Sequence, residues 1–142
     1  TKFINYTGID PKLKKKTKDK NIILLPGHIN NYFEDINKFN CILMIDVMHH
    51  IKKHEQLKIF QKILKNMNRN SIFIYKDISN RNYFFSTMNR LHDLFYNFEN
   101  INYLSFEDIL KTSKFNKKYS MNHFFKRILW YDHEFIVIKK NY

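Results

Sequence analysis

The sequence is poor in glycine, proline and cysteine. Its 142 residues include two glycines, two prolines and one cysteine. With Cys41 as the single cysteine, no disulfide can form within the chain, and its place in an apolar run predicts a buried, unreactive thiol. Only Gly8 and Gly27 supply backbone without a side chain. A glycine-rich loop that cradles phosphate must therefore lie outside this sequence.

Long uncharged apolar runs are also missing. No stretch approaches the roughly 18 apolar residues of a membrane span. The N-terminal residues lack the apolar core and small-residue cleavage site of a signal peptide. We therefore expect a cytoplasmic protein with no membrane partner. The chain begins with Thr1 instead of Met, which favours a fragment or a processed product.

Acidic residues are scarce: 13 Asp and Glu stand against 25 Lys and Arg, a net charge of +12. Such a charge raises nucleic acid as a partner. The excess is carried by Lys, however, and the chain is also rich in Asn, Ile, Phe and Tyr, which all have A/T-rich codons, so genome composition accounts for the bias. The densest basic run, residues 12–20, is predicted to be a solvated helix or loop. A nucleic-acid partner stays open but is not favoured.

Apolar runs alternate with amphipathic segments, without a repeat or a linker, so we expect one domain over residues 1–142. Strands are predicted at residues 2–9, 21–25, 40–46 and 71–77, and helices at residues 54–67, at residues 83–98 and from Ser105, which forms a capping box with Asp108. Pro11 suits the first turn of a further helix. The run at residues 21–25 predicts a buried strand, and residues 40–46, apolar on both faces, predict a central parallel strand covered by helices on each side.

The order of these elements predicts an α/β fold. Strand, helix and strand between residues 40 and 77 form a right-handed βαβ unit with parallel strands. The tail differs, because β-prone runs at residues 122–130 and 134–140 are separated by a turn signal and predict an antiparallel hairpin. The fold is therefore a sheet with parallel strands, completed by an antiparallel hairpin.

Three of the four predicted parallel strands end in an acid, namely Asp10, Asp46 and Asp77. The carboxyl ends of parallel strands share one edge of a sheet, where ligands bind in open α/β folds. Carboxylates at this edge can accept hydrogen bonds from ribose hydroxyls. Asp is also common at strand ends and helix caps, which explains one or two of the three acids more comfortably than all of them.

Several motifs resemble those of class I S-adenosylmethionine-dependent methyltransferases of the small-molecule type. Residues 8–11 (Gly-Ile-Asp-Pro) resemble the end of that family's second strand, where the acid holds the cofactor's ribose diol. Residues 25–29 (Leu-Pro-Gly-His-Ile) resemble the loop after the third strand, although His28 departs from the usual Gly-Asp-Ile. Only a neutral imidazole there accepts a hydrogen bond from the adenine amine. The most specific match is residues 46–50 (Asp-Val-Met-His-His), similar to Asp-Val-Leu-His-His after the fourth strand.

The resemblance covers nearly all the chain from Gly8 onward and implies a Rossmann-like methyltransferase sheet. Asn68 and Asn70 replace the paired glycines that precede the family's fifth strand, since Asn tolerates left-handed backbone. Residues 76–78 and 89–94 resemble one subgroup of the family. The family's first strand and glycine-rich loop are expected in front of Thr1. We therefore expect a single, incomplete methyltransferase domain whose methyl transfer is lost in this fragment.

The resemblance also implies S-adenosylmethionine as the cofactor and a small molecule as the substrate. The residues it places at the cofactor are Ile9, Asp10, His28, Ile29, Asp46 and Met48. If the acceptor must lose a proton, the candidate bases are His49, His50 and His92. One histidine of a His-His pair often packs or caps a loop instead. His92 and Asp93 are either a substrate-pocket pair or the polar edge of an amphipathic helix, and the second is slightly favoured. His50 and His54 are four residues apart, but no third metal ligand is evident, so no metal is expected.

Two other classes remain as alternatives. The acid after the second strand also suits a fragment of an NAD-binding oxidoreductase. The chain contains no Tyr-x-x-x-Lys pair of the short-chain reductase kind, and an antiparallel terminal hairpin is foreign to most dinucleotide folds. A basic nucleic-acid-binding or RNA-modifying module would interleave Lys and aromatic residues on one exposed face, whereas the aromatic residues here fall mainly on predicted core faces.

Overall fold

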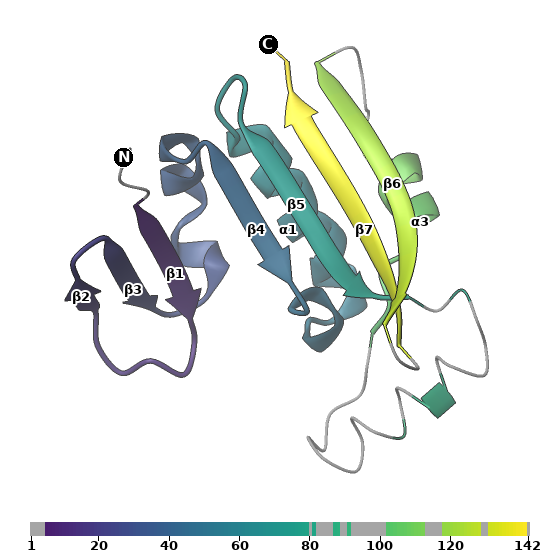
Figure 1. The fold of residues 1–142 in the computed structure, drawn as a ribbon, viewed down its shortest axis with the longest axis horizontal. Helices are drawn as coiled ribbons and strands as arrows, with labels where there is room; N and C mark the ends of the chain where they lie inside the picture. The colour runs from purple at the N-terminus through teal and green to yellow at the C-terminus, as the bar shows by residue number, and fades with distance from the viewer. Residues whose placement is uncertain are drawn as a thin grey trace. The chain divides into compact units, whose positions relative to one another are not determined.

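The computed structural model describes residues 5–79, 81, 87–88, 91, 102–112, 118–128 and 131–141. Its contacts divide the chain into two compact units, Thr1–Glu34 and Asp35–Tyr142, called here the first and the second unit. Each unit contains its own β-sheet (Figure 1). Most of the helix predicted at residues 83–98 lies outside the described residues. No helix among those residues has the length and apolar character needed to cross a membrane.

The first unit is a three-stranded sheet with the order β1-β3-β2. Strand β1 (Tyr6–Asp10) pairs in parallel with β3 (Ile22–Pro26), as the sequence predicts. A Cβ atom at Gly8 would lie 2.9 Å from Leu24 Cδ2, so glycine permits the close approach of these two strands. Two short 3₁₀ helices follow β3, η1 (Ile29–Asn31) and η2 (Phe33–Lys38), the second of which continues into the next unit.

The helix predicted from Pro11 is wrong. The amide of Leu13 donates to the carbonyl of Asp10 at 3.2 Å in a turn, and the chain returns as β2 (Thr17–Asp19), antiparallel to β3. Residues 12–20 contain Leu13 as their only apolar side chain, so a helix there would have no apolar stripe to bury. The prediction that this basic run is solvated is confirmed, since all of β2 is exposed.

The second unit is a four-stranded sheet with the order β4-β5-β7-β6. Strand β4 (Cys41–Ile45) is parallel to β5 (Ile72–Ile78), and the helix α1 (Lys53–Asn66) connects them. Strand β7 (Tyr131–Lys140) pairs antiparallel with both β5 and β6 (Tyr119–Ile128). The parallel strand-helix-strand unit and the terminal antiparallel hairpin are therefore confirmed, with boundaries that differ by a few residues.

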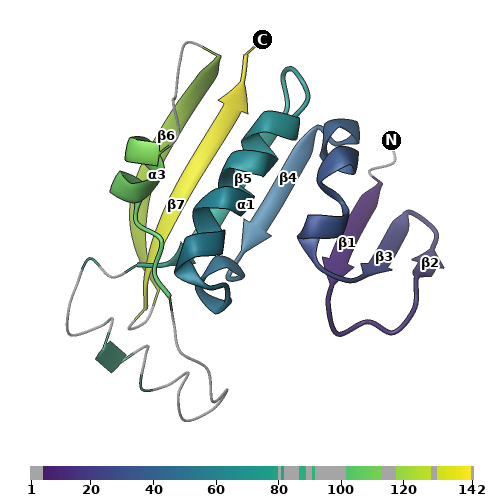
Figure 2. The ribbon, with the colours of Figure 1, turned by 180° about the vertical axis from the view of Figure 1, so that it is seen from behind.

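The core of the second unit lies between α1 and one face of this sheet (Figure 2). The ring of Phe60 on α1 packs against Phe73 and Tyr75 of β5, with centroid distances of 5.2 and 5.8 Å. Helix α3 (Phe106–Thr112) lies beside β6 and β7 (Figure 2). The amide of Asp108 donates to Ser105 Oγ at 3.2 Å, which confirms the predicted cap at the start of α3.

The predicted burial of β3 and β4 is wrong in part. Helix α1 covers the face of β4 that carries Met44, but the opposite face is open among the described residues: Leu43 is 59% and Ile45 49% exposed. Cys41 lies on this open face and is exposed, contrary to the prediction of a buried thiol. In β3, Ile22 and Leu24 are 47% and 38% exposed. Apolar composition on both faces predicted these strands correctly but not which faces are covered.

The loop before β5 confirms one of two predicted left-handed residues. Asn70 has φ 63°, in the left-handed region that Asn tolerates. Asn68 does not take this conformation; besides Asn70, the described residues with positive φ are Lys20, Asp46 and Gly27. The Asn68 carbonyl instead accepts from the amide and the hydroxyl of Ser71, at 3.2 and 2.6 Å.

Candidate functional site

In the first unit, the carboxyl end of β1 presents an exposed acid. The Oδ1 atom of Asp10 accepts a hydrogen bond from the amide of Lys12 at 2.7 Å, and Oδ2 accepts none from the described residues. The amide of Gly27 donates to the Asp10 carbonyl at 3.2 Å, so the turn after β3 is held beside this acid. Asp10 therefore keeps one carboxylate oxygen open for a ligand.

The turn after β3 is tightly packed. Gly27 has φ 113°, and a Cβ atom there would lie 3.2 Å from Asn31 Nδ2, so both backbone and space favour glycine. The hydroxyl of Tyr32 donates to the Pro26 carbonyl at 2.5 Å and fixes the strand end. His28 is exposed at the start of η1, and Ile29 is half-buried, as is Ile9 on β1. These residues and Asp10 thus gather at one end of the first unit's sheet.

In the second unit, Asp46 follows β4 in an unusual backbone conformation. Its φ is 53°, and its amide donates to the Lys76 carbonyl of β5 at 2.9 Å. The Oδ2 atom forms an ion pair with Lys76 Nζ. The Oδ1 atom is out of contact with solvent and accepts no hydrogen bond from the described residues. The acid and the lysine together stabilise the left-handed turn at the end of β4.

His49 is tied to the end of β5 by a buried carboxylate. Asp77, 2% exposed, accepts the amide of His49 on Oδ2 at 3.1 Å and contacts the His49 imidazole Nδ1 through Oδ1. The same Oδ1 accepts the amide of Ile78 at 2.8 Å. Both oxygens of Asp77 thus position one residue of the short 3₁₀ helix η3 (Met48–His50). This arrangement favours a positioning role for His49.

Gln56 is a site residue that the sequence reasoning missed. It lies fully buried on α1, and its Nε2 is within hydrogen-bond distance of three carbonyl oxygens: Met48 at 2.8 Å, Ile51 at 3.0 Å and Asn102 at 2.7 Å. An amide nitrogen has two hydrogens, so one of them is shared. The sequence does contain a sign of this role, because Gln56 lies four residues before Phe60 and therefore on the apolar face of the helix. Gln56 holds the loop after β4 in place.

The other predicted residues near η3 differ in exposure. Met48 is fully buried, and its carbonyl accepts from Gln56. His50 is exposed, and its ring centroid lies 3.9 Å from that of His49. His92 lies outside the described residues. Among the residues that the structure does describe, no three His, Cys, Asp or Glu side chains are grouped closely enough to hold a metal ion.

No protein-family model and no curated protein matches this sequence. Solved structures do match its fold. Magnesium protoporphyrin IX methyltransferase from Synechocystis PCC 6803, with bound SAH, matches with a TM-score of 0.59 and 11% identity over 85% of this chain. An O-methyltransferase family protein from Burkholderia thailandensis matches with a TM-score of 0.57 and 9% identity over 85% of the chain.

A third match is a methyltransferase from Thermotoga maritima, described as SAM-dependent and a possible histamine N-methyltransferase. Its TM-score is 0.52, with 13% identity over 85% of this chain. This chain has the class I methyltransferase fold. It spans 52%, 36% and 65% of the three proteins' lengths, less than two thirds of each. The predicted methyltransferase fold is confirmed, while the site residues stay predictions.

Tyr75 in the middle of β5 and His133 near the start of β7 both have shifted pKa values. Burial raises the pKa of Tyr75 well above its usual value, and the negative charges of Asp77, Glu134 and Asp46 raise it further. Tyr75 therefore keeps its proton at neutral pH. Burial lowers the pKa of His133, and the positive charge of Lys76 adds to the effect. Burial thus favours the uncharged form of His133.

Proposed function

We propose that this chain contributes the S-adenosylmethionine-binding residues to the methylation of a small molecule. The observation that carries the proposal is the open Oδ2 atom of Asp10, beside the tight Gly27 turn, in a chain with the methyltransferase fold. Bound S-adenosylmethionine would supply an activated methyl group. Asp10 would accept its ribose hydroxyls through charge-assisted hydrogen bonds. Ile9, His28 and Ile29 would contact the adenosine from the same end of the first unit's sheet.

Asp46 and Met48 are proposed separately as cofactor contacts of the second unit. Lys76 and Gln56 hold the backbone on either side of these two residues. Transfer from a sulfonium needs mainly positioning and exclusion of water, so a fixed loop serves the reaction better than a flexible one. A proposed contact from Met48 would come from its backbone, because its side chain is fully buried.

A proton acceptor is needed only if the methyl acceptor must be deprotonated. Of the two described candidates, His50 is exposed and His49 is buried against Asp77. A base must reach its substrate, so we assign the base to His50 and the positioning of η3 to His49. His92 stays a prediction without a structural assignment.

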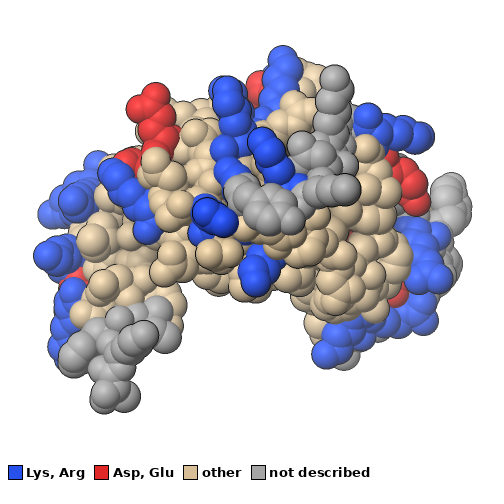
Figure 3. Space-filling model, turned by 90° about the horizontal axis from the view of Figure 1, so that it is seen from above, with Lys and Arg blue, Asp and Glu red and all other residues tan. Residues whose placement is uncertain are grey.

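The charge distribution supports a small molecule over a nucleic acid as the substrate. Lys and Arg side chains form several separate groups on the face seen in Figure 3, with uncharged atoms between the groups. A groove that tracks a phosphate backbone would instead line up basic side chains with exposed aromatic rings. Among the described residues, the large rings of Phe60, Phe73 and Tyr75 are buried, and the exposed Phe and Tyr rings are those of Tyr6 on β1 and of Phe124 and Phe125 on β6.

Titration of the chain with S-adenosylhomocysteine (SAH), followed by NMR, tests the cofactor. We expect SAH and adenosine to shift the amide signals of residues 8–10 and 27–29, and methionine alone to leave them unchanged. Asp10→Ala should weaken SAH binding by about 1.5–3 kcal/mol through the loss of charge-assisted hydrogen bonds. Asp19→Ala, which removes an exposed acid of β2, is the matched control and should not change the affinity.

Two results would overturn the proposal. The first is a shift of these signals by NADH without any shift by SAH or adenosine, which would favour the oxidoreductase alternative. The second is equal SAH affinity of the Asp10→Ala and Asp19→Ala proteins, which would remove Asp10 from the site. Amide exchange in β1 and β3 should accompany the titration, so that loss of the fold is not mistaken for loss of a contact.

A further inference from the structure

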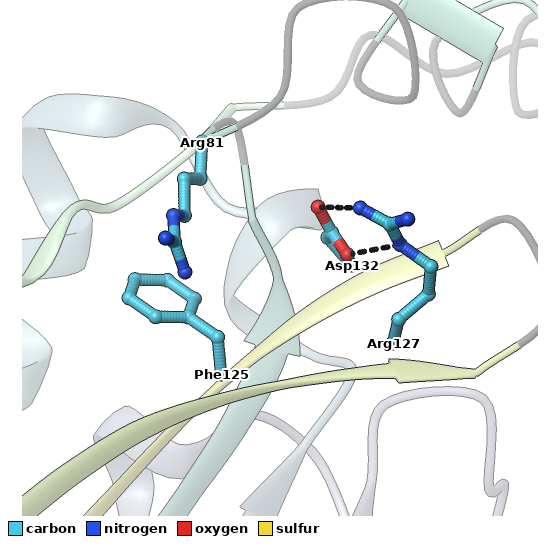
Figure 4. A pocket seen from close by; sticks show the side chains of 4 residues that line it. All are labelled: Arg81, Phe125, Arg127 and Asp132. Carbon is cyan, nitrogen blue, oxygen red and sulfur yellow. Dashed lines mark hydrogen bonds and ion pairs between the residues drawn. The ribbon is translucent and has the colours of Figure 1, made fainter.

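A small pocket opens where the β6–β7 hairpin passes the end of β5 (Figure 4). It is lined by Arg81, Phe125, Arg127 and Asp132 and has a volume of about 380 Å³. The amide of Ser79, just after β5, donates to the Asp132 carbonyl at 2.8 Å, and the amide of Arg81 donates to Ser79 Oγ at 3.1 Å. The pocket therefore lies at the carboxyl end of β5, the edge at which α/β sheets bind ligands.

The two arginines of the pocket have different partners. Arg127 donates to both carboxylate oxygens of Asp132, from Nε at 2.9 Å and from Nη2 at 3.5 Å. The guanidinium carbon of Arg81 lies 4.8 Å from the centre of the Phe125 ring. Arg81 forms no ion pair within the described part of the chain. Its guanidinium lies over the ring and has N–H groups that can donate to an anion.

The ring of Phe125, which lines the pocket, packs against neighbouring rings of β6 and α3. His123 meets Phe125 edge to face, with centroids 4.8 Å apart, and stacks on Phe106 of α3 at 3.8 Å. His123 Nε2 is 2.9 Å from Oε1 of Glu134, which is 4% exposed. The ring of Phe125 is thus fixed by packing on the hairpin side, and the apolar surface of the pocket exists before any ligand binds.

We propose that this pocket binds the carboxylate of a small planar molecule, with Arg81 on the carboxylate and Phe125 against the planar body. The proposal rests on the proposed function, because it makes this molecule the methyl acceptor. Two arginines and one aspartate give the lining a net charge of +1, which favours an anion over a neutral molecule. The planar fork of Arg81 suits two-point binding of a carboxylate. The volume is that of a small-molecule site.

Benzoate and benzamide are the probes, because they share shape and differ in charge. Each is titrated into the chain while the arginine Nε–H and nearby amide signals are followed by NMR. We expect benzoate to shift the signals of Arg81 and residues 125–127 and to bind at least about tenfold more tightly than benzamide. Equal affinities for the two probes would show that the pocket does not recognise a carboxylate and would overturn the proposal.

Arg81→Gln should reduce the benzoate affinity at least about fivefold and leave the weak benzamide affinity unchanged, because it removes charge while keeping a polar side chain. Arg69→Gln is the matched control: Arg69 is an exposed arginine in the loop before β5, outside the pocket lining. Equal losses in both variants would indicate a nonspecific charge effect and would overturn the assignment. The comparison of the two probes in the unaltered chain decides the matter if Arg81→Gln does not fold.

Titration with SAH in the same samples separates this inference from the proposed function. If benzoate binds through Arg81 and SAH does not bind, the pocket is a carboxylate site but the proposed methyl transfer fails. If SAH binds and benzoate does not, the proposed function stands and the pocket is not its acceptor site. A benzoate affinity that increases when SAH is present would link the two sites as expected for an acceptor and a methyl donor.

Discussion

The two units of the chain are stabilised in different ways. Strand β5 of the second unit alternates buried and half-buried side chains over most of its length. Its Phe73 and the neighbouring Phe60, Ile136 and Ile138 are 0% exposed. No residue of β1, β2 or β3 in the first unit is buried. The second unit therefore rests on a hydrophobic core, while the first rests on strand pairing and tight turns. Burial of an apolar side chain stabilises a fold by about 1.5–3 kcal/mol. We therefore expect the second unit to be the more stable of the two.

The position of the candidate residues follows this difference. In the second unit, the loop after β4 is held by the buried side chains of Gln56 and Asp77. In the first unit, the turn after β3 is held by the Gly27 backbone and by the half-buried Tyr32 hydroxyl. The proposed ligand contacts of the second unit would thus be preorganised by its core, and we expect those proposed for the first unit to become ordered more strongly when a ligand binds.

The largest expected effect comes from the core. Phe60→Ala should destabilise the second unit by about 3–5 kcal/mol, because it leaves a cavity against Phe73 and Tyr75. Leu24→Ala in the first unit removes a side chain that is 38% exposed and should cost no more than about 1 kcal/mol. Amide hydrogen exchange measures both, with the slowest amides of β5 and β3 reporting on the respective units. Equal losses would contradict the comparison between a core-stabilised and a turn-stabilised unit.

Loss of a side chain that holds the loop should also cost more stability in the second unit than in the first. Gln56→Ala removes a buried donor from three carbonyl groups and should cost at least about 2 kcal/mol, since buried carbonyls without partners are expensive. Tyr32→Phe removes one half-buried hydrogen bond and should cost about 0.5–1.5 kcal/mol. Urea unfolding, with exchange of the amides of residues 48–51 and 27–32, measures each loop. A larger effect of Tyr32→Phe would mean that the first unit depends on its turn more than the second depends on its core.

Much of the fold was predictable because periodicity records the backbone. The apolar runs that became β1, β3, β4 and β5 and the helical spacing of α1 were recognised within a few residues. So was the antiparallel pairing of β6 and β7, whose alternating side chains require an extended chain. Asn70 could be predicted as left-handed because few other residues tolerate that conformation, although the same reasoning failed for Asn68.

Burial was harder to predict, because it depends on which element covers a face. The sequence of β4 is apolar on both faces, yet Cys41 and Leu43 lie on a face that no described helix covers. For the candidate site, the motif identified Asp46 and His49, but not that Lys76 pairs with the first and Asp77 with the second. Those partners lie 30 and 28 residues away, and only the register of β4 with β5 brings them together.

The smallest expected effects are the pH dependences of two buried side chains of β7. The pKa of His133 is lowered from 6.5 by burial, so the unfolded chain binds its proton more readily, and stability should be lost as the pH falls below about 6.5. The pKa of Glu134 is raised from 4.5 by burial, and the hydrogen bond from His123 opposes this shift. The unfolded chain therefore loses this proton first, and stability should be lost as the pH rises above about 4.5.

The two variants should consequently change the pH dependence in opposite directions. In the unaltered chain between pH 5 and 6.5, His133 makes the free energy of unfolding rise with pH and Glu134 makes it fall. His133→Gln should abolish the rise, and Glu134→Gln should abolish the fall. Urea unfolding at about half-unit intervals of pH measures both. His54→Gln and Glu55→Gln are the controls, because both side chains are more than half exposed on α1. If both variants change the slope of unfolding free energy against pH in the same direction, burial does not determine the pKa shifts of His133 and Glu134. The core of the second unit would then not extend to the start of β7.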